Sequence, residues 1–188
     1  MNSKNSTRSL VITAFFAAIV FLGIQMFRIP LPAAVGTPFL HFGHIFVMLA
    51  VVCLGPVRSA IAGTLGLIIF DIVNGYMHAI PNVLVSTIIK CLFIGFLFLA
   101  LKKTAAGNKK LEYTYAVVCA AVYGVTNIVL DFIWNTVELV ILGSEFKAAF
   151  MAELTSIPAT IINAVFTVIG IALLFVPAKA AYDRINRK

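Results

Sequence analysis

The segment PNVLVSTIIKCLFIGFLFLALKK, residues 81–103, decides the fold class of this chain. Its apolar run extends from Asn82 to Leu101 and ends at Lys102 and Lys103. A helix that spans the hydrocarbon core of a bilayer needs about 20 mostly apolar residues. This segment has that length, and lysines are typical of the cytoplasmic end of a span. The segment therefore predicts a transmembrane helix.

The composition of the whole chain extends this prediction. The chain has 188 residues, of which 62% are hydrophobic and 11% are charged, and its mean hydropathy is +1.06. A soluble domain has about 25% charged residues, and a small domain leaves much of its surface exposed. The apolar surplus must therefore face lipid. This excludes an ordinary cytosolic enzyme, a disordered chain and a secreted disulfide scaffold.

Five further apolar runs complete a set of six expected spans, which are bounded by proline, glycine or basic residues. The six helices are expected at residues 9–27, 39–54, 57–74, 82–101, 113–142 and 152–176. Pro30 and Pro32 are expected to end the first helix, and Pro177 the last. The prediction is an all-α integral membrane protein with six transmembrane helices in one domain, residues 1–188.

The basic residues separate the two sides of these spans. The side that holds both termini carries eleven of the 14 Lys and Arg residues, whereas the other side carries Arg28 and Lys147. Cytoplasmic loops are rich in Lys and Arg, so both termini are predicted to be cytoplasmic, in a multi-pass protein of a prokaryotic-type cell membrane. This topology accounts for the net charge of +7. Nucleic-acid binding, which needs a basic patch on a soluble surface, is not expected.

Polar residues interrupt the spans mainly in their outer halves. On the run 113–142 they form one helix face, because their spacing follows the helical period. That face carries Asn127, Asp131, Trp134, Asn135 and Glu138. Ionisable groups at this depth are costly and usually face the interior of a bundle. A cavity open to the outside is favoured, although ion pairs of Lys90 with Asp71 or Asp131 that only hold helices together are an alternative.

The candidate ligand-binding residues come from the outer halves of the spans and from the loops beside them. They are His41, His44, Asp71, Asn74, Tyr76, Lys90, Asp131, Trp134, Asn135, Glu138 and Asn163. No Cys or carboxylate stands at metal-ligand spacing beside His41 and His44. These two are interpreted as hydrogen-bonding groups at the cavity rim or as plain interfacial histidines, and no metal or cofactor is predicted. The apolar loop 28–40 is expected to cap the cavity.

Two of the expected helices contain closely spaced small residues, which predict helix packing and no catalytic or binding chemistry. Ala14 and Ala18 form a small-xxx-small pair, with Ala17 beside them, which favours close packing within the chain or against a partner. Gly63 and Gly66 carry the same ambiguity, and no Gly-Lys-Ser/Thr follows them as a phosphate loop requires. The chain is therefore not expected to hydrolyse nucleotides, so concentrating a solute would need an ion gradient or another subunit.

Three stretches of the chain together resemble a known family. They are HFGHIFVMLA at residues 41–50, LGPVRSAIAG at residues 54–63, and the later positions Gly66, Asp71, Asn74-Gly75-Tyr76, Pro81 and Ile88-Ile89-Lys90. This pattern resembles the S components of energy-coupling factor (ECF) vitamin transporters, in the branch of riboflavin-type and hydroxymethylpyrimidine-type members. The branch often has Gly-Asp where this chain has Gly43-His44, and that difference bears on the ligand.

The resemblance implies a non-catalytic subunit that captures a vitamin outside the cell. It implies as partners a transmembrane T component and two ATP-binding ATPase subunits, and it makes Ala14, Ala17 and Ala18 the expected contact with the T component.

The charges of the expected site narrow the chemical class of the ligand. The carboxylates outnumber Lys90, which disfavours an anionic ligand and suits a neutral or weakly basic heteroaromatic compound that stacks on Trp134 or Tyr76. Hydroxymethylpyrimidine or a pyridoxine-like compound is the favoured expectation, with riboflavin or pantothenate as alternatives. A stand-alone secondary transporter is the alternative from another class, and an intramembrane enzyme that uses His41, His44 and Asp71 is a more distant one.

Overall fold

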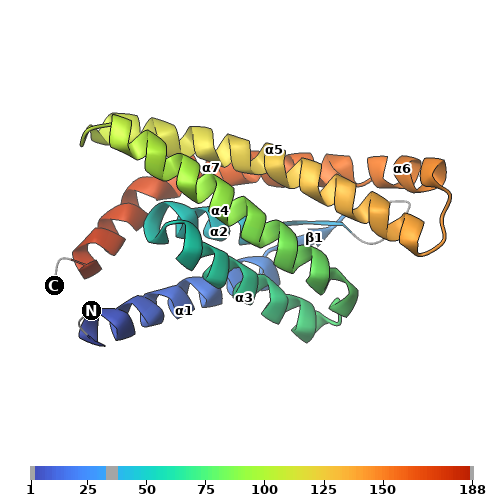
Figure 1. Cartoon of the computed structure of the whole chain (residues 1–188), viewed down its shortest axis with the longest axis horizontal. Helices are drawn as coiled ribbons and strands as arrows, with labels where there is room; N and C mark the ends of the chain where they lie inside the picture. Colours follow the sequence, from blue (N-terminus) through green and yellow to red (C-terminus); the bar gives the residue numbers. More distant parts are fainter. Residues whose placement is uncertain (1–2, 33–37, 187–188) are drawn as a thin grey trace.

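The computed structural model describes residues 3–32 and 38–186. In these residues the chain forms a helical bundle with one short hairpin (Figure 1). The elements are α1 (Ser3–Gln25), β1 (Arg28–Pro30), β2 (Phe39–His41), α2 (Gly43–Leu54), α3 (Pro56–Asn74), the 3-10 helix η1 (Met77–Ala79), α4 (Ile80–Thr104), α5 (Lys109–Ile141), α6 (Phe146–Leu154) and α7 (Ile157–Asn186). Both termini lie at one end of the bundle, and α6 lies at the other (Figure 1).

Five helices in the described part of the chain are long and apolar enough to cross a membrane: α1, α3, α4, α5 and α7. The expected span 39–54 has a different form, because it divides into β2 and the 12-residue helix α2. At 1.5 Å per residue α2 is about 18 Å long, whereas the hydrocarbon core is about 30 Å thick. The all-α fold is thus observed with five helices of spanning length and one shorter apolar helix.

The short helix α2 forms the centre of the bundle. Val47, Met48, Ala50 and Val51 have no exposed surface, and α2 contacts α1, α3 and α7. A helix that is apolar on all sides is buried either in protein or in lipid. Here its neighbours cover it, so its hydrophobicity serves protein packing and it does not need to match the bilayer thickness.

Two glycines allow helices of spanning length to approach closely. A Cβ atom on Gly66 of α3 would lie 2.6 Å from the backbone oxygen of Ala17 in α1, and one on Gly124 of α5 would lie 2.7 Å from Cβ of Ala164 in α7. Both distances are shorter than van der Waals contact. The close approach at Gly66 is therefore used for packing within the chain, and it buries Ala17.

The last expected span is displaced at both ends. Residues 152–154 belong to α6, and α7 begins only at Ile157. The sequence Ser156-Ile157-Pro158 starts the new helix, because proline is tolerated in a first turn where its missing N–H has no partner to lose. The expected stop at Pro177 is wrong, since α7 continues through it to Asn186.

The loop between α1 and α2 contains a small antiparallel hairpin. β1 pairs with β2 in a register that places Arg28 opposite His41 and Pro30 opposite Phe39. The helix-only expectation for this region therefore omitted two short strands. Residues 33–37 of the expected cap lie outside the described residues, but the hairpin itself fixes Phe39 and His41 beside the bundle.

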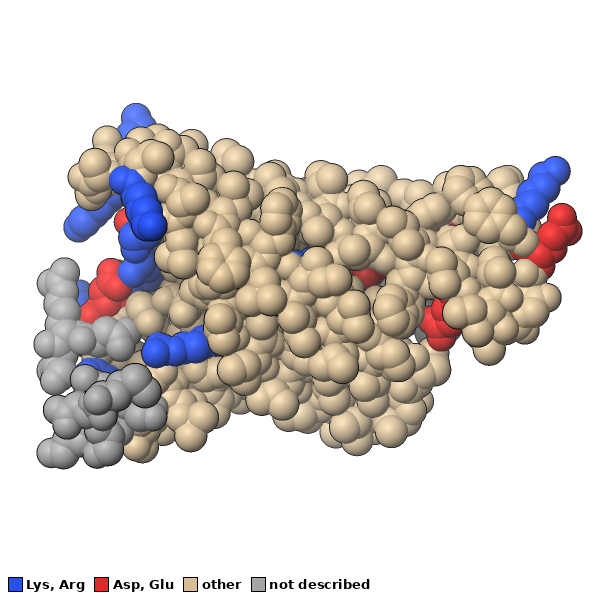
Figure 2. Space-filling model, in the orientation of Figure 1, with Lys and Arg blue, Asp and Glu red and all other residues tan. Residues whose placement is uncertain are grey.

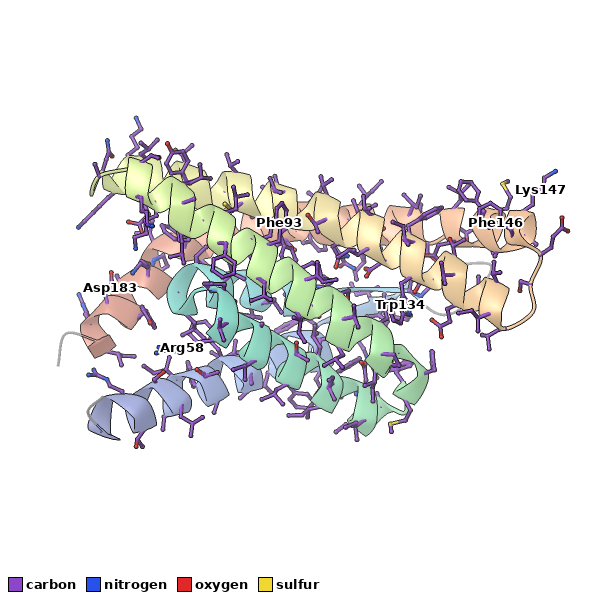
Figure 3. The ribbon with its side chains drawn as sticks, viewed as in Figure 1. Arg58, Phe93, Trp134, Phe146, Lys147 and Asp183 are labelled. Atoms are coloured by element: carbon purple, nitrogen blue, oxygen red, sulfur yellow. The ribbon has the colours of Figure 1, made fainter. Side chains whose placement is uncertain are left out.

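Charge divides the molecule along its long axis. On the face shown in Figure 2, Lys and Arg side chains gather at the end that holds the termini, and the middle of the bundle is almost free of charge. Arg58 and Asp183 lie toward this end, whereas Trp134, Phe146 and Lys147 lie toward the other (Figure 3). We call these the basic end and the α6 end.

Candidate functional site

A cavity of about 620 Å³ opens between the hairpin, α3, α4, α5, α6 and the start of α7. This volume lies in the range of small-molecule binding sites. Of the residues expected from the sequence, those that line it are His41, His44, Asp71, Tyr76, Lys90, Asp131, Asn135 and Glu138. Helices far apart in the chain thus bring most of the expected residues together around one space.

Three expected residues do not line the cavity. Asn74 donates hydrogen bonds to Gln25 Oε1 at 2.7 Å and to the backbone oxygen of Phe70 at 2.9 Å, so its side chain serves the contact between α1 and α3. Trp134 is half-buried on α5 outside the lining. Asn163 lies behind the cavity wall and acts on the hairpin.

Asn163 of α7 joins β2 to the bundle through two hydrogen bonds. Its Oδ1 accepts from the backbone N–H of His41 at 3.0 Å, and its Nδ2 donates to the backbone oxygen of Phe39 at 2.9 Å. One side chain thereby satisfies a donor and an acceptor of a strand that would otherwise be buried unpaired. Phe39 and His41, which line the cavity, are fixed in this way.

The imidazole rings of His41, which is buried, and His44, which is half-buried, lie beside each other with centroids 4.6 Å apart. His41 Nδ1 accepts a hydrogen bond from the backbone N–H of Gly43 at 3.1 Å, and His44 Nδ1 lies 3.1 Å from the hydroxyl of Tyr123. Burial, together with the charge of Lys90, lowers the pKa of His41 from 6.5 to about 4. His41 is therefore neutral at physiological pH, as an acceptor for Gly43 must be. No cluster of metal-ligating side chains is found in the described part of the chain.

A chain of three side chains crosses from α4 to α5. Lys90, which is 2% exposed, donates to Asn127 Oδ1 at 2.5 Å, and Asn127 Nδ2 donates to Asp131 Oδ2 at 2.7 Å. The amide thus connects a buried ammonium to a half-buried carboxylate without a direct ion pair. In this arrangement each charge has a hydrogen-bonding partner, which a low-dielectric interior demands.

A second chain connects α4, α5 and α6. Asn82 Nδ2 donates to Asn135 Oδ1 at 3.2 Å, and Asn135 Nδ2 donates to Glu153 Oε1 at 3.0 Å. Burial raises the pKa of Glu153, and the hydrogen bond from Asn135 opposes that rise. Sequence reasoning missed Glu153, because the apolar run 152–176 predicts residue 153 inside the last span. The pair Ser156 and Pro158, a helix-start signal, would have identified the break that turns Glu153 into the cavity.

The face of α4 toward the cavity was also only partly expected. Asn82, Ser86 and Lys90 recur every four residues and line the cavity together with Thr87. This spacing places them along one side of a helix. Sequence reasoning singled out Lys90 alone, although the same periodicity that revealed the stripe on α5 is present here.

Aromatic rings form another part of the wall. Phe39 and Tyr76 line the cavity, with ring centroids 6.2 Å apart, and Phe70 stacks on Tyr76 at 5.9 Å with an interplanar angle of 23°. The guanidinium of Arg28 lies 5.4 Å from the Phe70 ring centre. The cavity therefore offers flat apolar surfaces beside its polar groups, as sites for aromatic ligands do.

Among the described residues, none of the cavity carboxylates forms an ion pair with a cation. Among the described side chains the ion pairs are Lys102–Glu112 and Lys179–Asp183, both at the basic end. The alternative that Lys90 pairs directly with Asp71 or Asp131 is not observed. Four carboxyl groups and one lysine line the cavity: Asp71, Asp131, Glu138, Glu153 and Lys90. Such a site is suited to ligands that donate hydrogen bonds and carry no negative charge.

The expected contact residues of α1 divide into two kinds. Ala14 and Ala18 are exposed, whereas Ala17 is 6% exposed and packs toward Gly66. The exposed large side chains Leu10, Val11 and Phe15 surround Ala14. α1 therefore presents an apolar face with small residues on its outer side.

Comparison with known proteins gives one match. The family model of the ECF-type riboflavin transporter, S component, matches residues 4–182. No curated protein and no solved structure matches the chain.

Proposed function

This chain belongs to the family of ECF-type riboflavin transporter S components, and on that premise we propose that it captures a neutral or weakly basic heteroaromatic vitamin outside the cell for ATP-driven import. The family makes it a multi-pass membrane protein and a transport subunit. The favoured ligand is hydroxymethylpyrimidine or a pyridoxine-like compound. Riboflavin and pantothenate are the alternatives.

The observation that carries this proposal is the position of the cavity. It is formed beside α6, away from the basic end of the bundle. Because Lys and Arg favour the cytoplasmic side, the basic end with both termini is assigned to the cytoplasm. The cavity then opens to the outside, where a nutrient is captured.

The chemistry of the wall supports the ligand class. The carboxyl groups outnumber the single lysine, so a carboxylate-bearing vitamin such as pantothenate would meet like charge. The rings of Phe39 and Tyr76 suit a flat heterocycle. Riboflavin stays an alternative because the cavity volume of about 620 Å³ suits a ligand of drug size as well as a single ring.

The proposed partners are a transmembrane T component and two ATPase subunits. The exposed face of α1 around Ala14 and Ala18 is the proposed T-component contact, and Ala17 contributes by shaping the close approach of α1 to α3. Small residues allow a partner helix to approach closely within lipid.

The test is native mass spectrometry of the purified chain, followed by binding measurements with hydroxymethylpyrimidine, pyridoxine, riboflavin and pantothenate. We expect submicromolar binding of one heteroaromatic vitamin and none of pantothenate. Ser86→Trp should abolish binding, because Ser86 is buried and lines the cavity. Val85→Trp is the matched control, since its side chain is 40% exposed on the neighbouring position of α4.

Two results would contradict the proposal. One is the absence of submicromolar binding across the set of B vitamins. The other is ion-driven flux of the vitamin in liposomes that contain this chain alone, because such flux would make it a secondary transporter that needs no ATPase.

A further inference from the structure

We infer that the carboxylate of Asp71 is the specificity-determining group of the cavity and binds an N–H donor on the heterocyclic ring of the ligand or attached to it. This inference rests on the proposed function and deepens it, because it states which atoms of the vitamin are recognised and by which helix.

Asp71 is buried, and part of its carboxylate has no partner. Its side chain is 6% exposed and lines the cavity. Its Oδ2 atom has no hydrogen-bond partner among the residues that the structure describes. An unpaired buried carboxylate oxygen is costly, so a donor from a bound molecule would gain a strong, charge-assisted hydrogen bond here.

The neighbouring polar groups of the protein are already engaged elsewhere. Lys90 donates to Asn127, and Asn74 donates to Gln25 and to the backbone of Phe70. Arg28 lies over the Phe70 ring and forms no ion pair with Asp71. These contacts leave Asp71 Oδ2 without a donor from the described protein groups around it.

The other three carboxylates of the cavity differ from Asp71, because Asp131 and Glu138 are only half-buried and Glu153, although buried, has a hydrogen-bond partner. Asp131 receives a hydrogen bond from Asn127, and Glu153 receives one from Asn135. Their amide partners hold them in place, so part of their acceptor capacity is used by the protein. Asp71 is therefore the carboxylate with most to gain from a ligand donor.

A second orphan group lies on the adjacent helix. Thr87 of α4 is 1% exposed and lines the cavity, and its hydroxyl has no partner in the described part of the chain. Because a hydroxyl can donate or accept, it is available to a polar atom of the ligand at a second point along the cavity wall. Asp71 and Thr87 are thus two polar groups without described partners on the part of the cavity wall that α3 and α4 form.

The aromatic rings of Tyr76 and Phe39 form a surface close to Asp71 in the cavity. The backbone N–H of Tyr76 donates to the backbone oxygen of Asp71 at 2.8 Å, which fixes the two residues to each other. Tyr76 and Phe39 both line the cavity. A heterocycle stacked on these rings would thus present its edge on the side of Asp71. The ligand class is a nitrogen heteroaromatic with a ring N–H or an exocyclic amino group.

The test compares two pairs of probes whose members differ at one N–H donor. The first pair is 4-amino-5-hydroxymethyl-2-methylpyrimidine and its analogue without the amino group. The second pair is riboflavin and N3-methylriboflavin. Isothermal titration calorimetry should show, for at least one pair, an affinity at least tenfold higher for the member with the N–H donor. This measurement on the unmodified chain does not depend on the folding of any variant.

Three variants assign that preference to its source. Asp71→Asn should lower the affinity for the preferred probe at least tenfold and remove most of the preference within the pair. Thr87→Val should lower the affinity about threefold to tenfold. Thr64→Val is the matched control. Thr64 also has a buried hydroxyl without a partner among the described residues, but it does not line the cavity. The Thr64→Val variant should therefore bind the probe with unchanged affinity.

The negative outcomes separate the two proposals. The role of Asp71 is overturned if the two members of each pair that binds have equal affinities. It is also overturned if the Asp71→Asn variant binds both members with the affinities of the unmodified chain. In either case the proposed function stands. If none of the four probes binds, the role of Asp71 is overturned as well. The proposed function is then decided separately by the wider set of vitamins.

Discussion

The two sides of the cavity differ in whether their polar groups have hydrogen-bond partners within the protein. On the side of α5, α6, α7 and β2, which we call the bonded side, Asp131 and Glu153 receive hydrogen bonds from asparagines, and Asn163 joins β2 to the bundle. On the side of α3 and α4, which we call the open side, Asp71 and Thr87 have buried oxygens without partners among the described residues. Lys90 and Asn82 of α4 belong with the bonded side, because they donate to Asn127 and Asn135 of α5.

The difference separates two kinds of energetic role. A polar group that is fully bonded within the protein stabilises the fold, and its loss costs folding free energy. A polar group without a protein partner contributes to ligand affinity and costs stability while the cavity is empty. Substitutions on the bonded side should therefore change stability most, whereas those on the open side should change affinity most.

The largest effect is expected from Asn127→Leu on the bonded side. This change leaves the Lys90 ammonium and one Asp131 oxygen without the partner they now share. Removing a hydrogen-bonding partner from buried charges costs about 3 kcal/mol or more, and chemical unfolding in detergent would measure the loss.

Asn74→Leu is the matched control for this prediction. Asn74 bonds only to neutral groups, Gln25 and a backbone oxygen, so a loss of about 1 kcal/mol is expected. Equal losses of stability in the two variants would show that the Lys90–Asn127–Asp131 chain contributes no more to stability than hydrogen bonds between neutral groups.

A comparable loss of stability, limited to acidic pH, is expected from the protonation of His41 in the hairpin. Its pKa is lowered from 6.5 to about 4 in the folded protein, so the unfolded chain binds a proton first as the pH falls. Stability is therefore full above pH 6.5 and declines as the pH falls toward 4. At about 1.4 kcal/mol per pKa unit the decline from this group reaches about 3 kcal/mol.

His41→Asn should flatten this part of the pH dependence. Asparagine retains an acceptor for the backbone N–H of Gly43 but doesn't titrate. Unfolding midpoints measured between pH 7 and pH 4 would show the difference. A decline that is as steep in the variant as in the unmodified chain would assign the acid sensitivity to other groups.

A smaller loss is expected from Asn163→Leu, which removes both hydrogen bonds between α7 and β2. We expect a cost of about 1–3 kcal/mol in stability. Affinity should also fall, because Phe39 and His41 line the cavity. Thr167→Val, one turn further along α7 and equally buried, should leave the affinity unchanged. Unchanged affinity in Asn163→Leu would mean that the hairpin does not position the ligand.

The smallest effect is expected from Trp134→Ala. The sequence places Trp134 on the polar stripe of α5 and predicts that the ligand stacks on Trp134 or Tyr76. Because Trp134 does not line the cavity, we now expect a change in affinity of less than about threefold, measured by calorimetry beside Asp71→Asn. A loss as large as that of Asp71→Asn would place the ligand against a different face of α5.

The polar stripe on α5 shows how far helical periodicity leads. Asp131, Asn135 and Glu138 line the cavity, as their spacing predicts. Trp134 has a similar spacing but lies outside the lining, because a stripe on a helix is wider than the part of it that a cavity touches. Periodicity therefore identified the face of the helix, and packing decided which members of the stripe reach the site.

Glu153 shows where the local sequence was insufficient. Its role depends on the break between α6 and α7 and on Asn135, which lies 18 residues away in the sequence. Ser156 and Pro158 indicate a helix start, but the direction in which α6 folds back depends on packing against α5. No periodicity within residues 146–154 carries that information.

The sequence by itself determined that this chain lies in a membrane and which of its helices carry polar residues within their apolar runs. These features depend on local quantities: the length of apolar runs, the helical period and the residues that end each run. Only the tertiary structure decided which polar atoms find partners. Lys90 and Asn127 are 37 residues apart, and His41 and Asn163 are 122 apart. Such pairs form only when the bundle is packed, so the oxygens that stay unpaired on Asp71 and Thr87 are visible only in the folded protein.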